Sequence, residues 1–245
     1  MKTGSNRYDV CVIGAGVCGA NIARRLSAYE LDVALVDKEA DVSFGTSKAN
    51  SGIVHGGFHH NKKYLKARLE LQGMMMFDRL QQELDFPFKR CGIVVAALHE
   101  DEMRAIEQLY MQGVDNGFIG IEMCSRERML ELEPKLSSDC VGGLYAPGGG
   151  IVEPYRFVFS LVENAEKNGV RVVKGFKVAS ARREGERWTV AAADGRTIKA
   201  VFSGVANAVV TDVDLDAPVT YEGLAGAGSG MGSAGFIVYD DTACM

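Results

Sequence analysis

One glycine motif constrains this chain more than any other feature. Residues Tyr8–Asp37 read YDVCVIGAGVCGANIARRLSAYELDVALVD: a short apolar run, three spaced glycines, a helical stretch, a second apolar run and an acid. The first run, Val10–Ile13, is too short for a helix and suits a buried parallel strand. In this setting Gly-x-Gly-x-x-Gly is the dinucleotide-binding pattern of a βαβ unit. The sequence therefore predicts an α/β fold that begins with a Rossmann-type unit.

Each glycine of the motif has its own physical task. Gly14 permits a tight turn, Gly16 lets the backbone approach a pyrophosphate, and Gly19 lets the following helix pack closely on the sheet. The N–H groups and dipole at the start of that helix attract phosphate. The second strand, Val33–Val36, ends at Asp37, whose carboxylate can accept both ribose hydroxyls. An acid here disfavours a 2′-phosphate, so FAD or NAD is favoured over NADP.

Composition narrows the class of protein further. The 245 residues carry a net charge of −5 with interspersed charges, so nothing indicates a nucleic-acid partner. No apolar run approaches the roughly 18–20 residues of a membrane span. The N-terminal MKTGSNRYDV leads directly into the first strand and leaves no room for a signal peptide, so we expect a cytoplasmic protein. The six cysteines form no C-x-x-C pair, and the histidines show only the adjacent pair His59 and His60, so we assign neither a metal nor a disulfide.

The remaining pattern predicts an interrupted nucleotide domain. Helical spacing is found at about 64–84, 100–113 and 155–168. Alternation with intervening turns predicts an antiparallel meander over 177–182, 188–193 and 197–202. We therefore predict a nucleotide-binding domain at 1–60 and 151–212, an α+β insertion at 61–150, and a Gly-rich tail at 213–245.

Three segments carry a resemblance to a known family. They read DVCVIGAGVCGANIARRLS, GTSKANSGIVHGGF and GGGIVEPYRFVFSLVENAEKNGVRVV. Together they resemble the FAD-dependent oxidoreductases of the D-amino-acid-oxidase superfamily, of the glycerol-3-phosphate dehydrogenase and L-2-hydroxyglutarate oxidase type, over about residues 7–200. The resemblance implies FAD as the cofactor. It also implies a Rossmann-type FAD-binding domain interrupted by an α+β substrate-domain insertion and incomplete at its C-terminus.

The resemblance assigns residues to the cofactor and to catalysis. The implied cofactor-binding residues are Gly14, Ala15, Gly16, Val17, Cys18, Gly19, Asp37, Lys38, Thr46, Ser47, Asn50, Ser51, Gly52 and Val178. The glycine loop holds the pyrophosphate, Asp37 the adenosine ribose, and the backbone of Val178 the adenine. His55 is placed near the isoalloxazine as the catalytic candidate, because histidine can take the proton of a substrate hydroxyl. The alternative interpretation is that His55 is a loop histidine whose side chain only hydrogen-bonds the backbone.

Two features near the C-terminus depart from the family pattern. Where relatives have an N-A-A-G-type turn, Asn207-Ala208 is followed by no Ala-Gly. The tail from about Asp214 resembles a segment of the NADH-binding flavoprotein subunit of respiratory complex I, just ahead of its iron–sulfur cysteines. We therefore expect the front half of one flavoenzyme joined to a fragment of another, as in a truncated or fused product.

These observations give one leading function and two alternatives. The leading function is an FAD-dependent oxidoreductase that transfers a hydride from a small hydroxy acid, polyol phosphate or amino acid to flavin. One alternative is an NAD(H)-binding oxidoreductase component. The other is a nucleotide-binding fragment without independent catalysis, which needs a partner chain to complete its pocket. The substrate is thus a small molecule, and the electron acceptor is left open.

Overall fold

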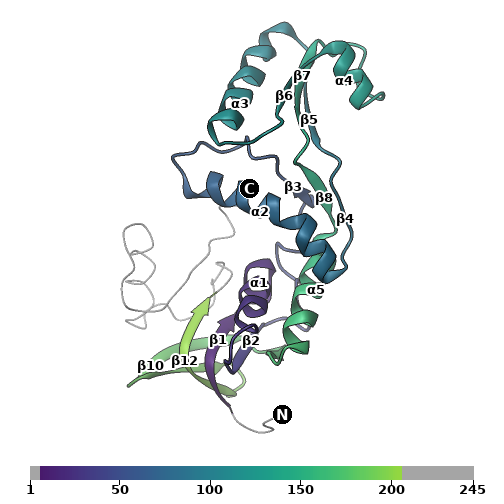
Figure 1. The fold of residues 1–245 in the computed structure, drawn as a ribbon. Coiled ribbons are helices and arrows are strands. Elements are labelled where there is room, and N and C mark those ends of the chain that lie inside the picture. Colours follow the sequence, from purple (N-terminus) through teal and green to yellow (C-terminus); the bar gives the residue numbers. More distant parts are fainter. Residues whose placement is uncertain (1–5, 206–245) are drawn as a thin grey trace. The chain divides into compact units, whose positions relative to one another are not determined.

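The computed structural model describes residues 6–205 and contains two compact units, which we describe separately (Figure 1). The first unit contains the described residues up to Asn50 and those from Pro154 onward, and the second unit is Ser51–Glu153. Asn207, Ala208 and the predicted tail lie outside the described residues. Within the described part of the chain, no helix is long and apolar enough to cross a membrane.

The first unit is built on a six-stranded sheet. Its strands are β1 (Arg7–Ile13), β2 (Val33–Val36), β9 (Arg171–Val173), β10 (Val178–Glu184), β11 (Arg187–Ala192) and β12 (Thr197–Val205). Their order is β10-β11-β12-β1-β2-β9. The antiparallel pairing of β10 with β11 and of β11 with β12 confirms the predicted meander. The sequence did not indicate that β12 also pairs in parallel with β1, which makes the meander part of the main sheet.

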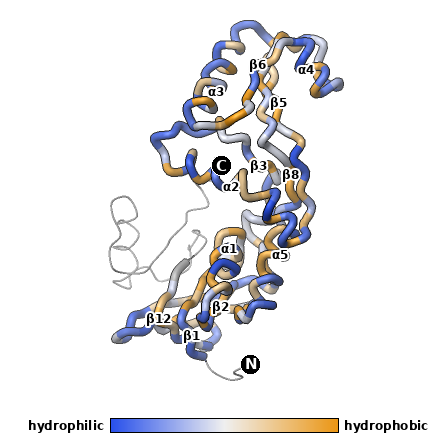
Figure 2. Tube along the Cα trace, in the orientation of Figure 1, coloured by the Kyte–Doolittle hydropathy of each residue, from blue (hydrophilic) through white to orange (hydrophobic). Residues whose placement is uncertain are grey.

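Two helices cover this sheet and explain the glycine and alanine content of the motif. Helices α1 (Val17–Leu26) and α5 (Pro154–Lys167) pack against each other, and each has hydrophobic and hydrophilic residues along its length in Figure 2. The buried residues of α1 are small, which permits this close approach: Gly19, Ala20 and Ala23. The buried stripe of α5 has helical spacing: Phe157, Val158, Leu161, Val162 and Ala165. Each large side chain on that stripe stabilises the fold by roughly 1.5–3 kcal/mol through burial.

The second unit has two small antiparallel sheets and three helices. One sheet has the order β3-β8-β4, from β3 (Ile53–Val54), β4 (Phe88–Lys89) and β8 (Gly150–Val152). The other has the order β5-β7-β6, from β5 (Ile93–Ala97), β6 (Glu122–Ser125) and β7 (Gly142–Ala146). The helices are α2 (Leu65–Leu84), α3 (Met103–Asp115) and α4 (Arg126–Leu132). The segment predicted as a helix at 100–113 begins with a 3-10 turn, Glu100–Glu102, before α3.

The core of the second unit surrounds the loop that follows β3. Phe58 in this loop is fully buried and packs with Ile106 of α3, Phe118, and Leu144 and Ala146 of β7. The loop therefore has a fixed position within the second unit, because one of its own side chains is part of the core.

Candidate functional site

The glycine turn lies at the carboxyl end of β1. Gly14 has φ +100°, a conformation that glycine adopts without strain, and its N–H donates to the carbonyl oxygen of Val36 at 2.8 Å. Gly16 is the N-cap residue of α1. On one side β1 pairs with β2, and on the other with β12, so its carboxyl end is a topological switch point. Open α/β sheets bind their ligands at such points.

The first turn of α1 is joined to a segment some thirty residues further along the chain. The N–H of Val17 donates to Oγ of Ser47 at 2.9 Å, and the N–H of Ser43 donates to the carbonyl oxygen of Ala15 at 3.0 Å. Ser47 is buried, with 7% of its surface exposed. The structure thus brings Ser47, one of the predicted cofactor residues, directly to the phosphate-binding end of a helix.

Asp37 is joined to the glycine loop by a short hydrogen bond. Its Oδ2 accepts from the N–H of Ala15 at 2.6 Å, and its Oδ1 accepts from the N–H of Glu39 at 2.9 Å. A carboxylate offers about four lone-pair sites, so two of them remain for ribose hydroxyls. Lys38, the next residue, is exposed.

The other predicted residues of the first unit lie at its surface or at the edge of its sheet. Thr46 and Asn50 are exposed, and Nδ2 of Asn50 donates to the carbonyl oxygen of Thr46 at 3.0 Å. Cys18 is half-buried in the first turn of α1. Val178 begins β10 and is buried in the same core cluster as Val36.

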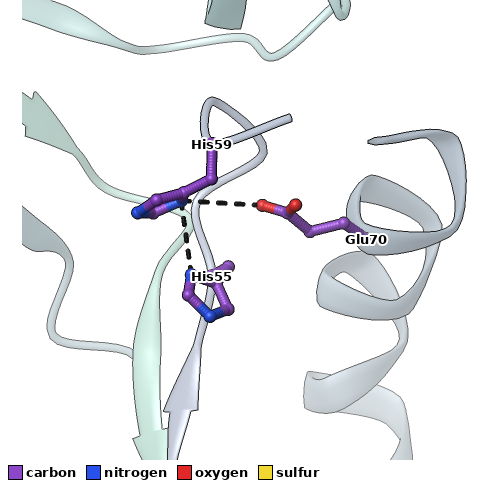
Figure 3. Close-up of side chains that lie close together, drawn as sticks. All are labelled: His55, His59 and Glu70. Carbon is purple, nitrogen blue, oxygen red and sulfur yellow. Dashed lines mark hydrogen bonds and ion pairs between the residues drawn. The ribbon is translucent and has the colours of Figure 1, made fainter. Parts of the chain in front are cut away.

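The second unit places His55 in a cluster of side chains that the sequence did not indicate (Figure 3). Nδ1 of His55 lies 3.3 Å from Nδ1 of His59, and the two rings are edge to face. Nδ1 of His59 lies 3.8 Å from Oε1 of Glu70 on α2. Of the two other predicted residues in this unit, Ser51 is exposed, and Gly52 has φ +66° and accepts from the N–H of Val152 at 2.8 Å.

The electrostatics of this cluster favour neutral rings at His55 and His60 beside an ionised carboxylate. Partial burial, followed by the charge of His59, lowers the pKa of His55 below its ordinary value. Burial also lowers the pKa of His60. Burial acts to raise the pKa of Glu70, but the hydrogen bond from His59 and the charges of the three histidines outweigh it, so the net shift is downward.

The sequence contained a signal for part of this cluster. His55 and His59 are separated by three residues, a spacing that occurs in metal and proton-transfer sites, but only His55 was singled out. Glu70 lies eleven positions beyond His59 and reaches it only because α2 packs beside the loop. No local pattern predicts such a contact.

The geometry of the first unit defines a class of protein: a dinucleotide-binding α/β fold whose chain is interrupted by a second unit after the second strand. The chain belongs to the FAD dependent oxidoreductase family, whose profile matches residues 9–216. The predicted resemblance to this family is confirmed, and FAD is favoured over NAD(H) for the site. The structure fits that cofactor, since the turn at Gly14, the start of α1 and Asp37 supply a phosphate seat and a ribose acceptor together.

Relatives and solved structures agree with this family. The chain is 45% identical over 177 residues to a glycerol 3-phosphate dehydrogenase of Caloramator mitchellensis, covering 72% of this chain and 37% of that protein. It is 31% identical over 179 residues to a glycerol 3-phosphate oxidase of Mycoplasma pneumoniae, covering 72% and 47%. The solved structure of dithionite-reduced L-alpha-glycerophosphate oxidase from Mycoplasma pneumoniae with FAD bound has a TM-score of 0.77 and 28% identity, covering 82% of this chain and 54% of that one.

The match does not extend over the full length of these proteins. The chain spans between 37% and 47% of the length of the two curated relatives named above. The resemblance of the tail to a complex I subunit stays a prediction, because that segment lies outside the described residues.

Proposed function

We propose that this chain is the FAD-binding portion of an oxidoreductase that oxidises a small polyol phosphate or hydroxy acid, with glycerol 3-phosphate as the first substrate to test. The observation that carries the proposal is the joining of three elements in the first unit. The glycine loop, Ser47 and Asp37 are held together by hydrogen bonds of 2.9 Å and 2.6 Å. The two glycerol 3-phosphate enzymes among the relatives support the substrate class.

Roles for individual residues follow from their chemistry. The backbone N–H groups at the start of α1 bind the pyrophosphate, and Ser47 places a hydroxyl beside them. Asp37 accepts the ribose hydroxyls, and the backbone of Val178 recognises the adenine. Thr46, Asn50, Ser51 and Gly52 provide further polar groups without bulk, and Lys38 lies beside Asp37.

His55 is the proposed proton acceptor. When bound, FAD supplies the hydride acceptor, which is the difficult part of the chemistry. The protein must then remove the proton of the substrate hydroxyl, which a neutral imidazole does well near neutral pH. His55 reaches solvent, and its lowered pKa keeps its ring neutral. This role requires no group other than the imidazole of His55.

The test has two stages. The purified chain is first examined by absorbance spectroscopy, and its released cofactor is identified by mass. Stoichiometric FAD supports the proposed site, whereas a colourless chain that takes up no added FAD contradicts it. The loaded chain is then mixed anaerobically with glycerol 3-phosphate or with L-2-hydroxyglutarate. Bleaching of the flavin supports the substrate class. FAD binding without bleaching by either compound supports the alternative of a nucleotide-binding fragment that lacks independent catalysis.

A further inference from the structure

We propose that His55, His59 and Glu70 form a binding site for a divalent transition-metal ion, and that zinc fits it best. The three side chains each offer one ligand atom, and these atoms all lie within 4.8 Å of one another. The two rings and the carboxylate lie on the loop after β3 and on α2, within the second unit (Figure 3). Neither the family match nor the proposed oxidation assigns a metal to these residues.

One distance within the cluster matches that of neighbouring ligands around an ion, and the others are somewhat longer. Nδ1 of His55 and Nδ1 of His59 are 3.3 Å apart, and Nδ1 of His59 is 3.8 Å from Oε1 of Glu70. Around a tetrahedral zinc with bonds of about 2.0–2.1 Å, neighbouring ligand atoms lie about 3.3 Å apart. An ion can therefore be bound once the Glu70 carboxylate moves closer to the two imidazoles. Two imidazoles and one carboxylate leave a fourth position for water.

The carboxylate of Glu70 is oriented by groups around it. The N–H of Gly57 donates to Oε1 at 3.0 Å, and Nε2 of His60 lies 3.7 Å from Oε2. The side chain of Glu70 is only 11% exposed. In metal sites, hydrogen bonds of this kind orient the ligands. Their loss typically lowers the affinity for the metal by about 10–100-fold.

The loop after β3, which carries His55, His59 and His60, is held in place before any ion binds. Nε2 of Gln112 donates to the carbonyl oxygen of Phe58 at 2.7 Å, and Nδ2 of Asn116 donates to the carbonyl oxygens of Gly57 and His60 at 2.9 and 2.7 Å. The ring of Phe58 stacks on His59 with centroids 4.1 Å apart. The site is therefore organised in advance, which reduces the entropy cost of binding.

The charges around the cluster bear on cation binding. Metal ligands must be unprotonated, so the affinity for the ion should fall as the pH is lowered. Lys66 is a cationic group that acts on His55 and His60 and would oppose the ion. The negative charge of Glu70 offsets the repulsion from Lys66. Three direct bonds to the metal ion further favour its binding.

The test uses cobalt as a visible probe and zinc as the expected ion. Cobalt(II) is titrated into the purified chain, and zinc binding is measured by equilibrium dialysis with metal analysis. We expect one ion per chain and visible cobalt bands of tetrahedral nitrogen and oxygen coordination. The variants His59→Ala and Glu70→Gln should each weaken binding at least ~10-fold. The control His99→Ala removes an exposed histidine outside the cluster and should leave the affinity unchanged.

Three results would overturn the proposal: no binding above the buffer background, unchanged affinity in both variants, or a cobalt–thiolate band that disappears when exposed cysteines are alkylated.

A measurement of thermal stability detects loss of fold in a variant. Zinc should raise the melting temperature of the unmodified chain and of His99→Ala, because an ion that binds only the folded state stabilises it. At the same zinc concentration the shift should be smaller in Glu70→Gln, whose side chain has the shape of the original. These measurements need neither FAD nor turnover, so they are independent of the proposed function.

Discussion

The carboxylate of Asp37 accepts a hydrogen bond of 2.6 Å from the backbone N–H of Ala15. This contact joins the end of β2 to the glycine loop that leaves β1, so the proposed ribose acceptor and the proposed phosphate site have a fixed separation. A hydrogen bond with one charged partner contributes about 1.5–3 kcal/mol. The position of the acid therefore matters for the shape of the loop as well as for its proposed contact with the ribose.

Replacement of Asp37 by alanine should weaken FAD binding. The variant loses the bond to Ala15 and the proposed ribose contacts, so we expect the dissociation constant to rise at least ~10-fold, as a loss of about 1.4 kcal/mol implies. Fluorescence titration with FAD measures this. The matched control is Asp41→Ala, which removes an acid whose Oδ1 accepts from Nζ of Lys174 at 2.6 Å and makes no hydrogen bond to Ala15. Equal affinity of Asp37→Ala and the unmodified chain would contradict the ribose role.

Replacement of Gly14 by alanine should reduce both stability and FAD binding. With φ at +100°, a side chain at this position is strained by about 1–3 kcal/mol. The control is Gly73→Ala in α2, where a Cβ would meet no atom within 4 Å and alanine has the better helix propensity by up to ~1 kcal/mol. Urea denaturation should show Gly14→Ala destabilised and Gly73→Ala unchanged or stabilised. A Gly14→Ala chain as stable as the control would mean that the turn adopts another conformation.

The sequence predicted the parts of the fold whose signals are local. The motif placed β1, α1 and β2 because turn glycines, apolar runs and the acid at Asp37 lie within one short stretch. The parallel pairing of β12 with β1 could not be predicted in this way, since Tyr8 and Ala200 meet only through the topology of the whole sheet. In the same way His55 was identified, but Glu70 was not, because their proximity depends on how α2 packs beside the loop.

Burial should divide the cysteines by reactivity. Cys11 is fully buried, and this burial raises the pKa of its thiol to about 12, whereas Cys91 is exposed. Since the thiolate is the reactive form, iodoacetamide should modify Cys91 in the native chain and leave Cys11 unmodified. Peptide mapping by mass spectrometry reads this out. In urea both should react, which confirms that the protection comes from folding. Rapid native modification of Cys11 would show that β1 is not buried in the sheet.

Truncation of the α5 stripe should destabilise the first unit. Leu161 is fully buried where α5 packs, so Leu161→Ala should lower the free energy of unfolding by about 2–5 kcal/mol. The control on the same helix is Tyr155→Ala, whose side chain is 39% exposed and should cost far less. Chemical denaturation followed by circular dichroism compares the two. Equal losses in both variants would indicate that α5 does not depend on this stripe.

Zinc should inhibit flavin reduction if both proposals hold. An imidazole that binds a metal through Nδ1 keeps its proton on Nε2, so the ion would prevent His55 from accepting the substrate proton. Anaerobic reduction by glycerol 3-phosphate should slow as zinc is added to the FAD-loaded chain. The variant Glu70→Gln should require at least ~10-fold more zinc for the same effect, because it lacks the charged ligand.

The variant His99→Ala provides the control for the zinc experiment, because it should retain the full sensitivity of the unmodified chain. Two other outcomes separate the proposals from each other. If cobalt binds to the cluster but zinc does not change the rate of flavin reduction, the metal site is supported and the role of His55 as the proton acceptor is contradicted. Inhibition of equal strength in Glu70→Gln would instead place the inhibitory ion elsewhere, since the side chain that supplies the only charged ligand of the cluster would then be irrelevant to the effect.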